Sequence, residues 1–196
     1  MKKMGSAAVL SMVILLSCSK KESVQPTAVA PAASAFIDYT IQAGKQFCDQ
    51  NTYTPLSITS LKFVVKFDSS AIYQTLNPSN QGDVNKLYGF SDNNAFHQDF
   101  SARFGWRWYH DKLSLQGYIY NNSVRDFQDL ATVDIGKEYT CAINVKDSLY
   151  EFVINGAVTR MPRKSTTPTA VGYKLYPYFG GDELAPHLIH IFIKPL

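Results

Sequence analysis

The sequence predicts an all-β fold, an antiparallel β-sandwich or jelly roll formed by residues 35–196. Three observations support this prediction. Apolar and polar residues alternate in many segments, which is the pattern of strands with one buried face. No segment of the domain keeps the apolar period of an amphipathic helix. Turn sequences such as Asn155-Gly156 separate the alternating segments, and their spacing predicts nine or more strands.

The first expected strands lie near residues 36–41, 61–67 and 87–90. In the second segment, Leu61, Phe63 and Phe67 alternate with Lys62 and Lys66. Successive side chains of a strand point to opposite faces, so this segment has one apolar and one basic face.

The clearest hairpin runs from residue 100 to residue 121, with His110-Asp111 as its two-residue turn. This turn pairs Arg103 with Tyr118 and places Trp106 on the opposite face. The face that contains Trp106 is apolar, and we expect it to join the core. The other face collects polar and aromatic side chains, namely Arg103, Arg107, Tyr109, Gln116, Tyr118 and Tyr120.

The remaining strands are expected at 139–145, 150–154, 157–161, 173–179 and 188–193. Asn155-Gly156 is a strong signal for a type I′ turn, because both central residues of that turn need a positive φ. This turn would place Arg160 opposite Glu151.

The first eighteen residues have the features of an export signal. Lys2 and Lys3 precede an apolar segment at 7–16, which has about half the length needed to cross a bilayer. The segment ends in Leu15-Leu16-Ser17-Cys18, which resembles the lipobox of bacterial lipoproteins. The resemblance implies that residues 1–17 are a cleaved signal peptide and that Cys18 carries a diacylglycerol and an acylated amino group. The alternative is an ordinary signal peptide followed by chance by a cysteine.

This resemblance implies a protein anchored by lipid in a membrane. Ser19 follows the lipidated position, where an aspartate would indicate inner-membrane retention in some bacteria. We therefore expect the outer membrane of a Gram-negative bacterium, at its periplasmic face or at the cell surface. Residues 18–34 are rich in small and polar residues, and they are expected to be a disordered tether.

The charge balance excludes some partners. Removing Lys2 and Lys3 from the 19 basic residues leaves 17 against 16 acidic ones, a net charge of +1. Nucleic-acid binding normally requires a basic footprint, so no nucleic-acid partner is expected. The size of the remaining chain predicts one domain.

Cys48 and Cys141 remain as thiols once Cys18 carries lipid. They could form a disulfide in an oxidising compartment. The alternative is that Cys141, which lies on the apolar face of an expected strand, is a free core residue.

Three segments combine aromatic residues with glycine and polar residues in a way that is typical of one known fold. They are Lys86-Leu-Tyr-Gly-Phe-Ser, Ser101-Ala-Arg-Phe-Gly-Trp-Arg-Trp and Tyr176-Pro-Tyr-Phe-Gly-Gly-Asp. They resemble concanavalin A-like jelly rolls over residues 60–196. This fold is the scaffold of many lectins, glucanases and polysaccharide lyases, so the resemblance implies an extracellular glycan as ligand.

The polar face of the central hairpin is the candidate binding surface. Aromatic rings stack on sugar faces, arginine forks pair with carboxylates, and Gln116 offers both a donor and an acceptor. The alternative is a solvated outer face on which tyrosines and arginines pair only with each other.

No catalytic residue is assigned from the sequence. The Glu-x-Asp-x-x-Glu strand of jelly-roll glucanases is missing, and Glu151 is expected to pair with Arg160. Polysaccharide lyases of this general fold use Arg, Gln, His and Tyr, and Arg103, Gln116 and Tyr118 are similar in type. The Arg-Ser/Thr-Glu-Leu, Gln-Ile/Val-His and Tyr-Phe-Lys-Ala-Gly motifs of those lyases are absent.

The sequence therefore favours glycan binding without catalysis. A polysaccharide lyase or a degenerate relative is the first alternative, and a structural envelope or adhesion module is the second. No cofactor or metal is expected. The loop with His97, Asp92 and Asp99 offers calcium-type ligands, but a solvated loop explains it better.

Overall fold

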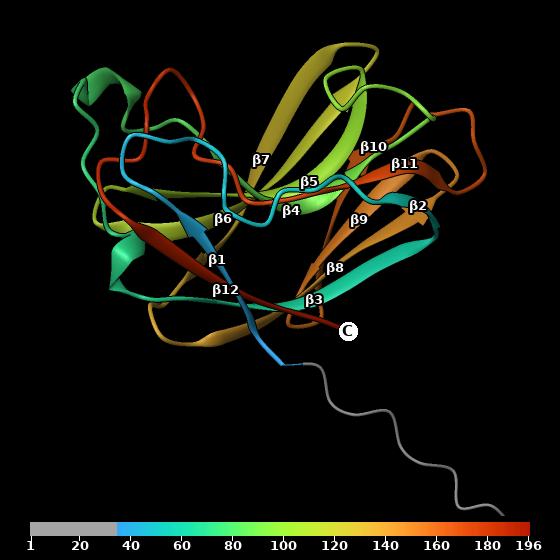
Figure 1. Ribbon diagram of the computed structural model, residues 1–196. Coiled ribbons are helices and arrows are strands. Elements are labelled where there is room, and N and C mark those ends of the chain that lie inside the picture. The colour runs from blue at the N-terminus through green and yellow to red at the C-terminus, as the bar shows by residue number, and fades with distance from the viewer. Residues whose placement is uncertain (1–34) are drawn as a thin grey trace, which may run out of the picture. The chain divides into compact units, whose positions relative to one another are not determined.

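The computed structural model describes residues 35–196, which form two six-stranded antiparallel sheets (Figure 1). The first sheet has the order β1 (Ile37–Ile41), β12 (Ile189–Pro195), β3 (Ser60–Phe67), β8 (Glu138–Lys146), β9 (Leu149–Ile154) and β10 (Ala157–Pro162). The second has the order β2 (Pro55–Ile58), β11 (Ala170–Leu175), β4 (Asn85–Ser91), β5 (Phe100–Tyr109), β6 (Lys112–Asn121) and β7 (Val124–Val133). Two short 3-10 helices, η1 (Ser69–Ala71) and η2 (Pro78–Asn80), lie between β3 and β4. The predicted all-β jelly-roll sandwich is confirmed.

The predicted register of the β5–β6 hairpin is also confirmed. Arg103 pairs with Tyr118 and Gly105 with Gln116. His110 and Asp111 have φ values of 51° and 54°, as a type I′ turn requires. The face that contains Trp106 packs against the first sheet, and Trp106 is fully buried. Phe104 links the two layers through edge-to-face contacts with Phe63 and Phe152.

Two strands, β2 and β7, were not predicted. The ten residues of β7 follow a turn at Asn122-Ser123, where φ is 50° and 64°. Most of β7 is exposed because it is an edge strand of the second sheet, so its sequence lacks a clear apolar alternation.

A buried ion pair fastens the loop after β10 to the end of β4. The Arg163 Nε atom lies 2.7 Å from Asp92 Oδ2, and both side chains are at most 1% exposed. Tyr150 of β9, in the opposite sheet, donates to the same carboxylate at 2.6 Å. Burial raises the pKa of Asp92, but the hydrogen bonds from Arg163 and Tyr150 outweigh it and hold that pKa below its usual range. Asp92 is therefore not part of a solvated loop, which corrects the expectation for this segment.

The disulfide between Cys48 and Cys141 is absent, because both residues are free, buried thiols. Cys141 lies in β8, whereas Cys48 lies outside β1, where the neighbouring Asp49 N–H donates to Thr40 O. Strands β12 and β3 lie between β1 and β8 in the first sheet, so several strand spacings separate the two residues. Disulfides require Cα atoms within about 7 Å.

Both thiols are expected to resist alkylation in the folded protein. Burial raises the pKa of Cys48 and of Cys141 to about 12, so almost no thiolate is present at neutral pH. Peptide mapping after iodoacetamide treatment should show both cysteines unmodified in the native state and both modified after unfolding in denaturant. Modification at full rate in the native protein would contradict their burial.

The lipidation site Cys18, the signal peptide 1–17 and the tether 18–34 lie outside the described residues. Within residues 35–196, no helix has the length and apolar character needed to cross a membrane.

Candidate functional site

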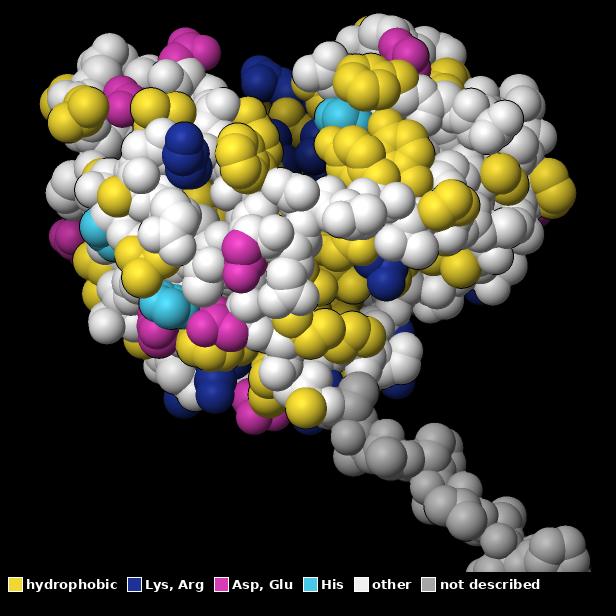
Figure 2. All heavy atoms as spheres, viewed as in Figure 1, with side chains coloured by type: hydrophobic (Ala, Val, Ile, Leu, Met, Phe, Trp, Pro, Cys, Tyr) yellow, Lys and Arg dark blue, Asp and Glu magenta, His cyan; other side chains and the backbone are white. Residues whose placement is uncertain are grey.

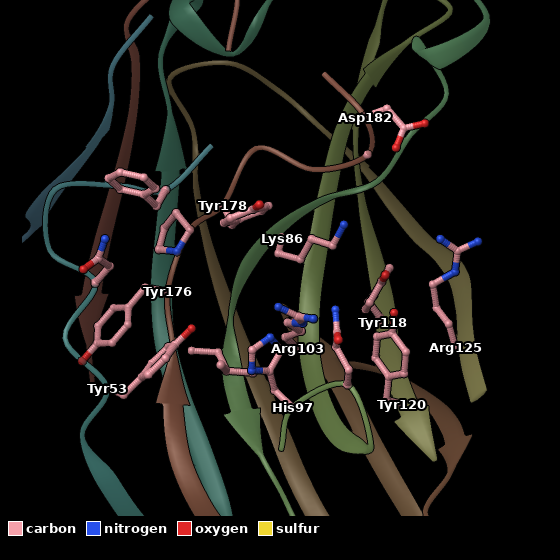
Figure 3. A pocket seen from close by; sticks show the side chains of 16 residues that line it. Tyr53, Lys86, His97, Arg103, Tyr118, Tyr120, Arg125, Tyr176, Tyr178 and Asp182 are labelled. Atoms are coloured by element: carbon pink, nitrogen blue, oxygen red, sulfur yellow. The ribbon is translucent and has the colours of Figure 1, made fainter. Parts of the chain in front are cut away.

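A cleft of about 600 Å³ opens on the outer face of the second sheet, away from the core. Figure 2 shows it as a hollow between two raised lobes, with lysine and arginine side chains at its bottom. Its floor comes from β4, β5 and β6, which contribute Lys86, Arg103, Tyr118 and Tyr120 (Figure 3). Arg125 of β7 forms one wall. The other wall contains Phe47, Asn51, Tyr53, Tyr176, Pro177 and Tyr178.

The aromatic wall is held in place by backbone hydrogen bonds across the chain. Lys86 N–H donates to Tyr178 O at 2.8 Å, and Tyr178 N–H donates to Lys86 O at 2.9 Å. Phe179 N–H donates to Gln46 O at 2.7 Å, which ties the loop after β1 to the same segment. These contacts join parts of the chain that are far apart in sequence, and they fix the wall relative to the floor.

Arg103 is the most unusual group of the site. Its side chain is buried in the floor with only 7% of the residue exposed, and its Nε atom has no hydrogen-bond partner among residues 35–196. Its guanidinium carbon lies 5.3 Å from the centroid of the Tyr118 ring, which gives a cation–π contact but no neutralising charge. A buried cation without a carboxylate partner among residues 35–196 is costly.

Lys86 and Arg125 complete a cluster of three cations. Within the described residues, no carboxylate forms an ion pair with any of the three. Among residues 35–196, Lys86 Nζ donates only to Val84 O, and it lies 5.0 Å from the centroid of the Tyr118 ring. Burial and, to a smaller extent, repulsion by Arg103 and Arg125 lower the pKa of Lys86 to about 8, although the nearby Asp83 acts in the opposite direction. Three cations therefore line the cleft, and within the described residues Asp182 is the one carboxylate among its lining residues.

His97 supplies an uncharged polar group. Its Nδ1 atom lies 2.9 Å from the Tyr173 hydroxyl, which also accepts the His97 backbone N–H at 3.1 Å. Burial lowers the pKa of His97 to about 4, and the nearby Arg103 acts in the same direction. At neutral pH this imidazole is uncharged.

Three of the six predicted ligand-binding residues line the cleft, and three do not. Arg103, Tyr118 and Tyr120 lie in it, although Arg103 and Tyr118 are more deeply buried than an open strand face implies. Arg107, Gln116 and Tyr109 lie outside it. A bulge opposite Leu115 and Gln116 brings Asp129 of β7 close to that part of the face.

Arg107 and Gln116 have structural partners. Arg107 holds Asp129 with two hydrogen bonds of 2.9 Å. Gln116 is fully buried and donates to Asp129 and to Ser114. Tyr109 borders a separate, shallower hollow with Trp108. Arg107, Gln116 and Tyr109 therefore do not share the cleft with Arg103, Tyr118 and Tyr120, and a ligand-binding role for them stays a prediction.

Sequence reasoning missed several lining residues, namely Lys86, Arg125, His97, Tyr53 and Tyr176. The Tyr-Pro-Tyr segment at 176–178 supported only the resemblance to jelly rolls and was not predicted to line a site. Arg125 was missed together with its strand β7.

The chemistry of the lining side chains restricts what the cleft can do. Among the described residues, Asp182 is the one carboxylate that lines the cleft, so the cleft lacks the pair of carboxylates that glycoside hydrolysis normally needs. In the same part of the chain, no three His, Cys, Asp or Glu side chains are grouped to hold a metal ion. The cleft places three cations, Lys86, Arg103 and Arg125, next to aromatic side chains.

No protein-family model and no curated protein sequence matches this chain. Solved structures share its fold. Alginate lyase vAL-1 from Chlorella virus superposes with a TM-score of 0.53 at 9% identity, over 86% of this chain and 86% of that chain. Alginate lyase AlyC3 gives a TM-score of 0.55 at 10% identity, over 82% of this chain and 74% of that chain. At these identities the likeness establishes the jelly-roll fold.

Proposed function

We propose that this chain is a lipid-anchored extracytoplasmic protein that binds an acidic glycan in the cleft without cleaving it. One observation carries the proposal: Lys86, Arg103 and Arg125 meet in the cleft with no carboxylate partner among the described residues, next to exposed aromatic rings.

The unbalanced charge supports an anionic ligand. Removing one partner of a buried charge pair normally leaves a large penalty, and Arg103 is held in such an unpaired state. A ligand carboxylate could accept hydrogen bonds from its planar guanidinium, which fits carboxylates in a bidentate manner. Lys86 and Arg125 would add attraction without the same directionality.

The aromatic rings support a sugar as the carrier of that charge. Tyr53 is 56% exposed and Phe47 is 55% exposed, so both rings offer apolar surface to a ligand. Two of the solved structures that share the fold are named as alginate lyases, and alginate is an acidic polysaccharide. Fold likeness does not transfer an activity, so the cleft residues carry the proposal.

Cleavage by β-elimination at the same cleft is the second candidate, because tyrosines lie beside Arg103. Burial raises the pKa of Tyr118 to about 12, with the neighbouring Tyr120 acting in the same direction, so this phenol is protonated at neutral pH. Ligand absorbance after long incubation distinguishes the two functions, since elimination produces an unsaturated sugar that absorbs ultraviolet light.

The test is a calorimetric titration of the full chain with acidic and neutral oligosaccharides of equal length. Binding to the acidic series alone, weakened by salt, is expected because exposed charges are screened. Lys86→Met should weaken binding, whereas Lys62→Met should not, since Lys62 lies exposed on β3 of the other sheet. Equal affinity for neutral and acidic sugars, or no binding at all, would refute the proposal.

Binding is expected to weaken as the pH rises through about 8. Lys86 is charged below its pKa of about 8 and loses its proton above it, while the sugar carboxylates stay ionised throughout. Affinity should therefore be constant from pH 6 to 7 and should fall roughly tenfold by pH 9.5. Lys86→Arg should remove this pH dependence, because arginine stays protonated. A wild-type profile that stays flat to pH 9.5 would show that Lys86 does not contact the anion.

The lipid anchor is tested separately with Cys18→Ser. This variant is expected to remain as an uncleaved precursor or to be soluble, because the acyl chains provide the anchor. Mass spectrometry and detergent-phase partitioning measure both outcomes. Unchanged cleavage and partitioning in the variant would contradict lipidation at Cys18.

A further inference from the structure

The exposed ring of Tyr53 and the cations Lys86 and Arg103 lie in different parts of the cleft. In Figure 3, Lys86 and Arg103 lie in the middle, Tyr53 and Tyr176 lie to one side, and Asp182 lies on the opposite side from Tyr53. A ligand long enough to contact all of these residues would meet three different environments in turn.

Among the described residues that line the cleft, the cations Lys86, Arg103 and Arg125 all lie away from the side of Tyr53 and Tyr176. Tyr53 packs against Tyr173 with ring centroids 4.8 Å apart, and Thr54 Oγ1 lies 3.3 Å from the Tyr176 hydroxyl. The ring faces are the negative part of an aromatic quadrupole, so they favour an apolar sugar face over a carboxylate. A second charged sugar placed here would lose water without gaining a counter-ion.

The opposite side carries two aspartates together with the cation Arg125. Asp182 lines the cleft, and a smaller hollow of about 150 Å³ continues from it past Lys86 and Arg125. Asp83 lines that hollow, and neither aspartate forms an ion pair among the described residues. A carboxylate next to these aspartates would be repelled, since like charges at short range are destabilising.

We infer that the cleft selects an acidic heteroglycan, in which the acidic sugar is flanked by uncharged sugars, over a homopolymer in which every sugar is acidic. The acidic sugar lies over Lys86 and Arg103, one uncharged neighbour stacks on the Tyr53 side, and the other lies beside Asp182. This inference rests on the proposed function, because it assigns the ligand class of the same cleft.

The test compares two probes of equal length in calorimetric titrations of the full chain. Hyaluronan oligosaccharides alternate acidic and neutral sugars, whereas polymannuronate oligosaccharides carry a carboxylate on every sugar. We expect the alternating probe to bind roughly tenfold more tightly, although it carries less charge. Equal or tighter binding of the homopolymer would overturn the inference and leave the proposed function intact. Failure of both probes to bind would instead count against the proposed function.

Two variants separate the two flanks. Tyr53→Ala should weaken the alternating probe roughly tenfold and the homopolymer much less, whereas Tyr109→Ala, a matched exposed tyrosine outside the cleft, should change neither. Asp182→Asn should strengthen binding of the homopolymer and leave the alternating probe unchanged. Equal effects of each variant on the two probes would contradict the assignment of the flanks.

Discussion

Asp92→Ala is expected to lower the free energy of unfolding by about 3–5 kcal/mol, the usual cost of breaking a buried ion pair by removing one partner. The substitution leaves Arg163 charged, with its side chain only 1% exposed. Arg163 loses the hydrogen bonds that its Nε and Nη2 atoms donate to the Asp92 carboxylate. It also removes the acceptor of the Tyr150 hydroxyl, which connects β9 of the first sheet to the end of β4. Urea denaturation measures the change.

The matched control is Glu151→Ala, which removes an ion pair at the surface. Arg160 in that pair is 62% exposed, so the loss should be about 1 kcal/mol or less. A cost for Asp92→Ala no larger than that for Glu151→Ala would show that the buried pair does not hold the loop. Because the pKa of Asp92 is held low, its stabilisation is present near neutral pH and should disappear as the pH falls through that pKa.

Arg103→Met is expected to abolish most glycan binding while leaving the fold as stable as before or more stable. Methionine fills a similar volume without burying an unpaired charge, so the free energy of unfolding should rise by about 1 kcal/mol or more. Loss of a buried charged contact to the ligand costs about 2 kcal/mol or more, which is roughly a thirtyfold loss of affinity. Calorimetry and thermal denaturation of the same samples measure both quantities.

Arg107→Met provides the comparison, because Arg107 is a neighbouring arginine that already has a carboxylate partner in Asp129. The Arg107→Met variant should be less stable than the wild type and should keep its affinity for the glycan, which is the reverse of the result expected for Arg103→Met. If Arg103→Met destabilised the protein and bound the glycan normally, Arg103 would be a structural residue. The main evidence that the cleft binds an acidic glycan would then be lost.

The central part of the fold could be predicted from the sequence because local turn chemistry determines it. The His110-Asp111 turn fixes the β5–β6 register, and Asn155-Gly156 places Arg160 opposite Glu151 as predicted. Strand alternation then separates the core face of Trp106 from the face of Arg103. These features depend on residues that are close in the sequence.

The cleft could be predicted only in part because its walls depend on contacts between distant segments. The paired hydrogen bonds between Lys86 and Tyr178 bring the aromatic wall to β4, and no local pattern encodes them. Arg125 lies on an exposed edge strand without clear alternation. Arg107 and Gln116 both bind Asp129, which lies on the same exposed strand. The sequence therefore could not show that these two residues have a structural partner and that Arg103 has none of this kind.

The most direct test of the proposed binding site is hydrogen exchange of the full chain with and without a saturating acidic oligosaccharide. Slower exchange is predicted in residues 45–54, 118–125 and 175–182, which form the walls and floor of the cleft, and Arg103→Met should show no such protection. Protection that falls instead on the outer face of β3 and β8, or bound ligand with unchanged exchange in these three segments, would contradict the assignment of the cleft as the binding site.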